Sequence, residues 1–157
     1  MNSTILQRRG SCLTVLLCLL PGCGSSGPPA ITEVEGVVLL DGRPVHSAQI
    51  ELYPMQSGLD AEWISRGITD KDGKFRLTMG AEQKPGAAVG RHRVVVRDAP
   101  PPPESRDQSA RGQEILMKYR SSLANRRIPD ACTAVGTTKL EIEVKPDQKQ
   151  YEIALPR

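Results

Sequence analysis

The sequence predicts an all-β fold, a seven-stranded antiparallel β-sandwich over residues 33–157, and two observations support this prediction. Short runs of alternating apolar and polar residues recur between turn-forming residues, which is the pattern of strands that bury one face. Most gaps between these runs are too short for the helical crossovers that a parallel sheet needs. Because a single sheet would leave its apolar face in water, we expect two sheets packed face to face.

Seven runs are expected to form strands. In chain order they cover residues 34–40, 48–53, 63–69, 74–79, 91–97, 139–144 and 150–155. The fourth run has the clearest pattern, because Phe75, Leu77 and Met79 alternate with polar side chains. In the fifth run, His92 and Val94 share the apolar face. The chain has one tryptophan, one phenylalanine and three tyrosines, so the core is expected to consist mainly of Val, Ile and Leu, which favour strands.

Two turns between these runs carry aspartate and glycine. Asp41 and Gly42 follow the first run, and an Asp-Gly pair favours a tight turn. Asp70, Asp72 and Gly73 lie between the third and fourth runs. Asp side chains stabilise the backbone of such turns, and Gly adopts positive φ there. We therefore expect a structural role for these five residues.

The gap over residues 98–136 is the exception to the regular spacing of strands. Its first part, Pro100–Pro103, favours extended polyproline structure, and Glu104–Gln113 is polar. Glu114–Leu123 is compatible with a short helix. Loops of this length are usually functional or disordered. We expect a mobile, proline-rich loop, which is also the best candidate for a partner-recognition surface.

The N-terminal segment, residues 1–22, has the parts of an export signal. Arg8 and Arg9 form a basic start, and the apolar stretch Cys12–Leu20 has the length of a signal-peptide core. A transmembrane helix needs about 20 apolar residues. Pro21 and the glycine after it end the stretch with helix-breaking residues. The segment is therefore predicted to be removed.

The processing site predicts an anchored product. Leu20-Pro21-Gly22-Cys23 resembles the Leu-x-(Gly/Ala)-Cys site of bacterial lipoproteins, with proline at the middle position as a departure. That resemblance implies a diacylglycerol on Cys23 and an added N-acyl chain such as palmitate, and two or more chains suffice for stable anchoring. The alternative is an ordinary signal peptide followed by an incidental cysteine. Residues 23–32 would form a flexible tether to the membrane.

Charge and cysteine content argue against a nucleic-acid-binding protein and against a disulfide-bonded domain. Arg8 and Arg9 are two of the 21 basic residues, so 19 basic and 18 acidic side chains remain after processing. A nearly neutral domain gives no electrostatic reason to expect nucleic acid as a partner. Cys12 and Cys18 leave with the signal and Cys23 would be acylated, which leaves Cys132 without a disulfide partner.

Four motifs in order resemble carboxypeptidase-regulatory-like domains. They are Val34–Val45 (V-x-G-x-V-x-x-D-G-x-P-V), Gly67–Leu77 (G-x-T-D-x-x-G-x-F-x-L), Gly86–Val94, and Ile128-Pro129 with Thr137–Leu140. The resemblance covers residues 33–157 and departs at Cys132, where the family more often has an aromatic residue. It implies a transthyretin-like (prealbumin-like, Ig-like) sandwich of the kind found in planctomycete lipoproteins, generally without catalytic activity.

The residues that carry chemistry in other proteins have simpler interpretations here. The Asp70–Gly73 turn resembles the start of a calcium loop, but position twelve is Ala81 rather than glutamate. His46, His92 and Cys132 have no zinc-site spacing. The three arginines of the fifth run are expected to form a solvated sheet face rather than an anion site. They are Arg91, Arg93 and Arg97.

These observations predict a membrane-anchored, non-catalytic lipoprotein on the extracytoplasmic side of the cell envelope, with a structural or protein-interaction role. No cofactor and no metal is expected. The alternative is a carbohydrate or cell-wall polymer binding module, for which Tyr53 and Trp63 are the available aromatics. Less favoured is a transthyretin-like hydrolase of the hydroxyisourate type that depends on His46 or His92. Such hydrolases end in Tyr-Arg-Gly-Ser, whereas this chain has only a weak internal counterpart of that motif at Tyr119–Ser122.

Overall fold

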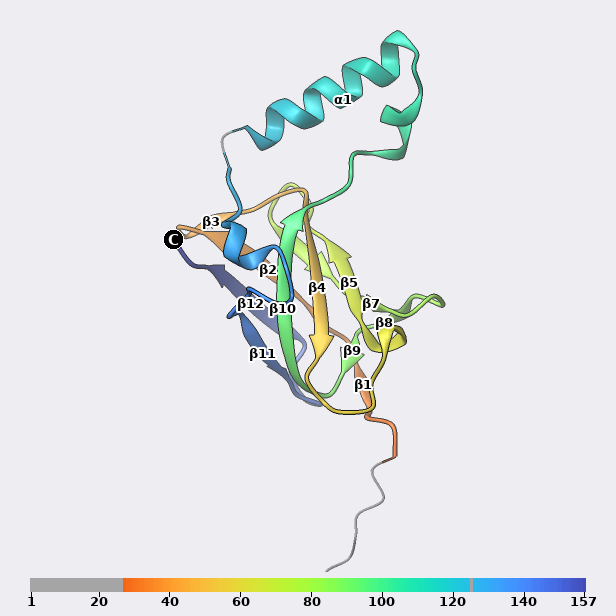
Figure 1. Ribbon diagram of the computed structural model, residues 1–157, viewed down its shortest axis with the longest axis vertical. Helices are drawn as coiled ribbons and strands as arrows, with labels where there is room; N and C mark the ends of the chain where they lie inside the picture. Colours follow the sequence, from red (N-terminus) through yellow and green to blue (C-terminus); the bar gives the residue numbers. More distant parts are fainter. Residues whose placement is uncertain (1–26, 125) are drawn as a thin grey trace, which may run out of the picture.

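Figure 1 shows the computed structural model of the chain, which describes residues 27–124 and 126–157. The predicted signal peptide, residues 1–22, lies outside the described residues, as do Cys23 and residues 24–26 of the tether. Within the described ranges, two large sheets and one small sheet form the body of the protein, and one α-helix projects from it. The all-β prediction is confirmed.

The larger sheet has six strands in the order β11-β10-β4-β5-β7-β8, and all its pairs are antiparallel. The strands are β4 (Ala48–Pro54), β5 (Ser65–Ile68), β7 (Thr78–Met79), β8 (Lys84–Pro85), β10 (Gly90–Asp98) and β11 (Glu141–Val144). Strands β4 and β10 form its longest pairing, from His92 opposite Pro54 to Asp98 opposite Ala48. This pairing places the alternating Val and Ile residues of both strands on one apolar face.

The second sheet is built around β2 (Glu35–Leu40). Along one side of β2 lie two short antiparallel partners, β3 (Arg43–Pro44) and β6 (Lys74–Arg76). Its other partner is β12 (Gln150–Leu155), which runs parallel to it. The prediction of a wholly antiparallel fold is therefore wrong at this pair, because the whole six-stranded sheet lies between β2 and β12 in the chain and serves as the crossover.

The strand count also differs from the predicted seven, because the described residues contain twelve strand segments. The predicted run 74–79 is split between two sheets, since β6 pairs with β2 whereas β7 pairs with β5. The run 63–69 begins later, because Ala61–Trp63 forms a short 3₁₀ helix (η1). Two further short strands, β1 (Ile31–Thr32) and β9 (Ala87–Ala88), pair with each other.

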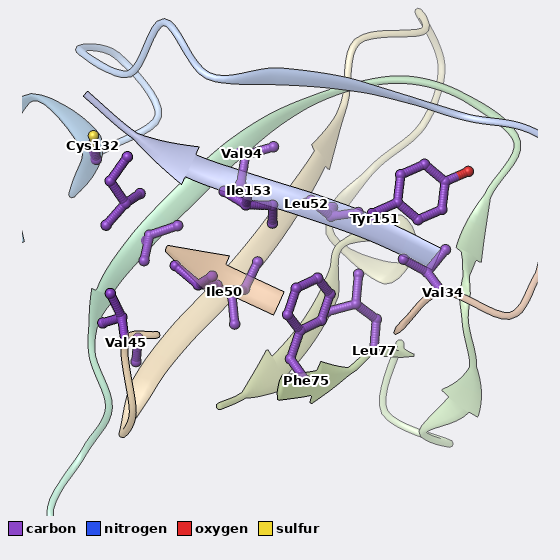
Figure 2. Packing of buried hydrophobic residues seen from close by; sticks show 14 of the residues in the cluster. Val34, Val45, Ile50, Leu52, Phe75, Leu77, Val94, Cys132, Tyr151 and Ile153 are labelled. Atoms are coloured by element: carbon purple, nitrogen blue, oxygen red, sulfur yellow. The ribbon is translucent and has the colours of Figure 1, made fainter. Parts of the chain in front are cut away.

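The core lies between the two large sheets and is mainly aliphatic. Figure 2 shows Ile50, Leu52 and Val94 of the larger sheet opposite Ile153 and Phe75 of the smaller one. The first three side chains are fully buried. The predicted alternation in the fourth run is confirmed, because its apolar members Phe75, Leu77 and Met79 are all buried.

The long segment after β10 contains helical structure. It begins with a 3₁₀ helix, η2 (Pro103–Arg106), and continues in the α-helix α1 (Ala110–Leu123) and a last 3₁₀ helix, η3 (Asp130–Cys132). Helix α1 starts before the expected residue 114, because Ser109 Oγ accepts a hydrogen bond from the Gly112 backbone N–H at 3.2 Å. The mobility of this segment stays a prediction.

Candidate functional site

The chain enters the sandwich at one end and presents a helix at the other. Strand β1 lies at the lower end in Figure 1, whereas α1, β3 and the C-terminus lie at the upper end. Within residues 27–124 and 126–157, no helix is long and apolar enough to cross a bilayer. We call the end with α1 and β3 the distal end.

The aspartates and glycines predicted for turns lie in turns. Asp41 and Gly42 have φ values of 52° and 74° and join β2 to β3. Asp70 Oδ1 accepts hydrogen bonds from the backbone N–H groups of Asp72 and Lys74, both at 2.9 Å. The Asp70 carboxylate thus caps its own turn, which is the role expected of an Asx turn.

The second turn also packs against β3. Gly73 has a φ of 72°, and a Cβ atom there would lie 2.8 Å from Pro44 Cβ. The Asp72 carboxylate accepts a hydrogen bond from Lys71 Nζ at 2.7 Å, and this bond lowers the pKa of Asp72. The two carboxylates of the turn therefore have partners within the turn itself.

His92, which was predicted to share the apolar face of its strand, and Cys132 are both buried. His92 is 1% exposed and donates from Nε2 to the Ala88 carbonyl oxygen at 2.7 Å, while its Nδ1 has no partner among the described residues. Burial lowers the pKa of His92 and raises the pKa of the Cys132 thiol. Both groups are therefore held in their neutral forms. The structure brings no three His, Cys, Asp or Glu side chains of its described part into a metal-binding group.

A buried carboxylate that the pattern of alternation did not predict lies on the outer face of the six-stranded sheet. The Glu51 side chain is 3% exposed, although its position in β4 is opposite to the core. Its Oε1 accepts from Arg97 Nη2 at 2.8 Å, Arg66 Nε at 3.2 Å and Gln49 Nε2 at 2.8 Å, and its Oε2 accepts from the Tyr53 hydroxyl at 2.8 Å. We call these five residues the Glu51 cluster.

The electrostatics of the Glu51 cluster favour the charged form of the carboxyl group. Burial by itself would raise the pKa of Glu51, but the hydrogen bond from Tyr53 and the charges of Arg97 and Arg66 outweigh it and lower the pKa. Burial, followed by the hydrogen bond to Glu51, raises the pKa of Tyr53. The carboxylate has donors on both oxygens, so it stabilises the sheet rather than offering a free acceptor.

The arginine row on β10 lies on the outer face of the sheet, and each of its members has a local partner. Arg97 is bound to Glu51, Arg91 Nη2 lies 2.6 Å from Glu141 Oε2, and Arg93 Nη1 donates to the Val135 carbonyl oxygen at 3.2 Å. These side chains hold the outer face together by local pairs. Arg66 lies directly opposite Glu51 in the pairing of β4 with β5. A sequence-based prediction of that pairing would therefore have identified part of the Glu51 cluster.

Three hollows on the surface of the described residues are relevant to a candidate site. One of about 730 Å³ lies over the outer face of β2, β6 and β12 and includes Glu35, Val37 and Tyr151. A second of about 250 Å³ is lined by Trp63 and by the acidic residue Glu62. The third has a volume of about 910 Å³ and lies at the distal end, between the β2–β3 turn, the residues after α1 and the C-terminus.

The third hollow, which we call the distal hollow, is rich in arginine. Its charged and titratable lining residues are Asp41, Arg43, His46, Arg126, Arg127 and Arg157. Sequence patterns did not predict this grouping, because the arginines come from three separate parts of the chain. His46, on which the hydrolase alternative could depend, is half-buried, and its Nδ1 lies 3.2 Å from Ser47 Oγ.

Comparison with known proteins finds no family model, no curated protein and no solved structure that matches this chain.

Proposed function

We propose that the protein is a membrane-anchored, non-catalytic lipoprotein with a structural or protein-interaction role at the extracytoplasmic side of the cell envelope. The observation that carries this proposal is the sequence Leu20-Pro21-Gly22-Cys23 at the end of a short apolar segment. Its resemblance to a lipoprotein processing site implies a mature protein that begins with an acylated Cys23. The four motifs that resemble carboxypeptidase-regulatory-like domains agree with such a role.

The position of β1 is compatible with an anchor that precedes the sandwich. Strand β1, the first strand of the described residues, lies at the end of the sandwich opposite to α1 and β3. An anchor at Cys23 would therefore hold that end near the lipid surface and leave the distal end facing away from it. The few residues between Cys23 and β1 span at most about 30 Å when extended, so the domain would remain close to the membrane.

The surroundings of the core residues support a non-catalytic role over the hydrolase alternative. A general base needs a proton-accepting atom within reach of a substrate. His92 is fully buried, and Cys132 is buried with a raised thiol pKa. Of His46, His92 and Cys132, only His46 is among the lining residues of the hollows described above. A hydrolase would have to rely on this one histidine.

Acylation at Cys23 is tested by labelling the full chain in cells with a fatty-acid analogue. The Cys23→Ala variant is expected to lose the label and to leave the membrane fraction or remain unprocessed. Cys18→Ala is the matched control, because Cys18 lies in the same apolar segment and is predicted to be removed. Undiminished labelling of Cys23→Ala, or an intact mass that retains residues 1–22 in the membrane fraction, would contradict the proposal.

The interaction role is tested by crosslinking in envelope fractions. The anchored protein is expected to give reproducible crosslinked neighbours, and the Cys23→Ala variant is expected to lose them because it is no longer held at the envelope. Identical neighbours for both proteins would show that the anchor does not determine the protein's contacts.

Trp63 gives the carbohydrate alternative a specific site. This half-buried indole lines the hollow of about 250 Å³ together with Glu62 and Glu82, and aromatic faces with nearby carboxylates suit sugar rings. Tyr53 is less suited, because its hydroxyl is bound to Glu51. If the protein binds cell-wall polysaccharide, Trp63→Ala should abolish retention in a pull-down, whereas Met55→Ala, at another exposed apolar side chain, should not.

A further inference from the structure

The distal hollow contains a buried guanidinium group with unused donors. The Arg126 side chain is only 10% exposed. Its Nη2 donates to the Ser47 carbonyl oxygen at 2.9 Å and lies 3.2 Å from Asp98 Oδ1. Its Nε and Nη1 are also buried and have no hydrogen-bond partner within residues 27–124 and 126–157. An arginine has five N–H donors, so most of the hydrogen-bonding capacity of this side chain is unused.

Unused buried donors are costly, which makes Arg126 an unusual lining residue. A buried polar group without a partner costs about 1–3 kcal/mol, and more when it is charged. Burial lowers the pKa of Arg126, against the opposing effect of the Asp98 charge. One half-exposed carboxylate thus compensates this guanidinium only in part. Both atoms are closed to solvent in this conformation, so a ligand in the hollow would remove this cost by accepting hydrogen bonds from Nε or Nη1 after a rotation of the Arg126 side chain.

The other arginines of the distal hollow surround Arg126 with positive charge. Arg157 Nε lies 2.6 Å from Asp41 Oδ1, and Arg127 Nη2 lies 3.0 Å from Asp130 Oδ2. Arg43 is exposed on the short strand β3 and has no carboxylate partner in the described part of the chain. Three of the four guanidinium groups therefore have one carboxylate each, whereas Arg43 has none.

This arrangement favours a multiply charged anion over a single carboxylate. A carboxylate is already available to three of the arginines, and each of these pairs is exposed on at least one side. A tetrahedral phosphate group presents more oxygens and up to two charges, so it accepts hydrogen bonds from several guanidinium groups at once. The volume of about 910 Å³ also leaves room for a larger molecule that carries the phosphate.

We propose that the distal hollow binds a phosphate group of a soluble or polymer-borne ligand, with Arg126 as the buried anchor and Arg43 as its exposed partner. The hollow lies at the end of the sandwich opposite to β1, which is why a phosphate away from the bilayer is favoured over a lipid headgroup. This proposal deepens the proposed function by naming the chemistry of the distal end, and it rests on the anchor only for that orientation.

Calorimetric titration of the detergent-solubilised full chain with inorganic phosphate tests the proposal at constant ionic strength. Saturable binding to one site is expected. Arg43→Gln should weaken it about tenfold, which corresponds to the loss of about 1.4 kcal/mol from one charged contact. Arg126→Gln should weaken it more, but this variant also loses the bond to Ser47. Arg43→Gln is therefore the decisive variant, because its side chain is exposed and makes no ion pair with the described residues.

Arg111→Gln is the matched control, since Arg111 is exposed near the start of α1, about 20 Å from the end of the helix that borders the hollow. It is expected to bind phosphate as the unaltered chain does. Absence of saturable binding, an equal loss in Arg111→Gln and Arg43→Gln, or equal affinity for acetate would each overturn the proposal.

Vesicles that contain phosphatidylglycerol distinguish the source of the phosphate. The unaltered chain and Arg43→Gln are expected to bind them equally, because the distal end faces away from the bilayer. Weaker vesicle binding by Arg43→Gln would assign the site to lipid headgroups and overturn the proposal of a soluble ligand. Phosphate binding in detergent does not depend on acylation. Absence of phosphate binding therefore leaves the acylation test at Cys23 unaffected, and absence of acylation leaves the phosphate test unaffected.

Discussion

Replacement of Glu51 by glutamine removes one charge from the outer face of the six-stranded sheet while preserving the shape of the side chain. In the Glu51→Gln variant, the new amide oxygen can still accept from Gln49, Arg66 and Arg97, and the new amide nitrogen can donate to the Tyr53 hydroxyl. The substitution therefore tests the charge of the Glu51 cluster rather than its packing.

The expected magnitude follows from the exposure of the partners. Hydrogen bonds between charged groups contribute about 1.5–3 kcal/mol when buried, whereas exposed ion pairs contribute about 0.2–1 kcal/mol. Glu51 is 3% exposed, but the side chains of Arg66 and Arg97 are 49% and 47% exposed. Each of the two pairs therefore belongs nearer to the exposed range. We expect Glu51→Gln to lower the free energy of unfolding by about 1–2 kcal/mol.

Urea unfolding monitored by circular dichroism measures this difference. Glu35→Gln is the control, because Glu35 also accepts from an arginine, Arg76 at 3.1 Å, but on an exposed surface. The control is expected to change stability by less than about 0.5 kcal/mol. If both variants have the same small effect, burial does not strengthen the Glu51 pairs and the reasoning fails.

The pH dependence gives a second check on Glu51. Its pKa is lower in the folded protein than the ordinary value of 4.5, so the carboxylate contributes stability above that value. This contribution is lost as the pH falls through the folded pKa. The difference between the unaltered chain and Glu51→Gln should therefore shrink below pH 4.5. A difference that stays constant down to about pH 2 would show that charge is not its cause.

Three further predictions concern the core. The pKa of His92 in the folded protein lies below its ordinary value of 6.5, so the unfolded chain takes up a proton at a higher pH than the folded chain does. The free energy of unfolding should therefore fall by up to about 1.4 kcal/mol per pH unit below pH 6.5. The pH dependence of stability in His92→Gln should lack this slope. Gly36→Ala should destabilise by about 3 kcal/mol or more, because a Cβ would overlap the Tyr151 carbonyl across β2 and β12; denaturation of Gly27→Ala, which has open space, should show no change. Cys132 should react with a thiol reagent only at the rate of unfolding, and rapid labelling of the native chain would show that it is not buried.

The all-β class was predictable because alternation reports directly which side chains are buried. Phe75, Leu77 and Met79 illustrate both the strength and the limit of this signal. All three are buried, yet Phe75 belongs to β6 and Met79 to β7, in different sheets. The alternation continues through the change of sheet because both sheets face the same core. Periodicity indicates the buried face of a strand, but it does not identify the neighbour.

Pairings between distant strands were the main limit on the candidate sites. Alternation does not predict the burial of Glu51, because this residue lies opposite to the core residues of β4. Its burial depends on long side chains from β5 and β10 that bind its carboxylate. The distal hollow likewise joins Arg43, Arg126 and Arg157, which no local pattern relates. Both features require the register of the sheets, which composition and local spacing do not contain.

The parallel pairing of β2 with β12 has a consequence for when this protein can fold. Gln150 lies beside Glu35, 115 residues away along the chain, so the second sheet is complete only after the last strand has been synthesised. Contacts of such long range are slow to form, because the cost of closing the loop precedes the gain from pairing. If the chain is exported unfolded, as proposed, the dependence of this sheet on β12 delays its completion on the side of synthesis.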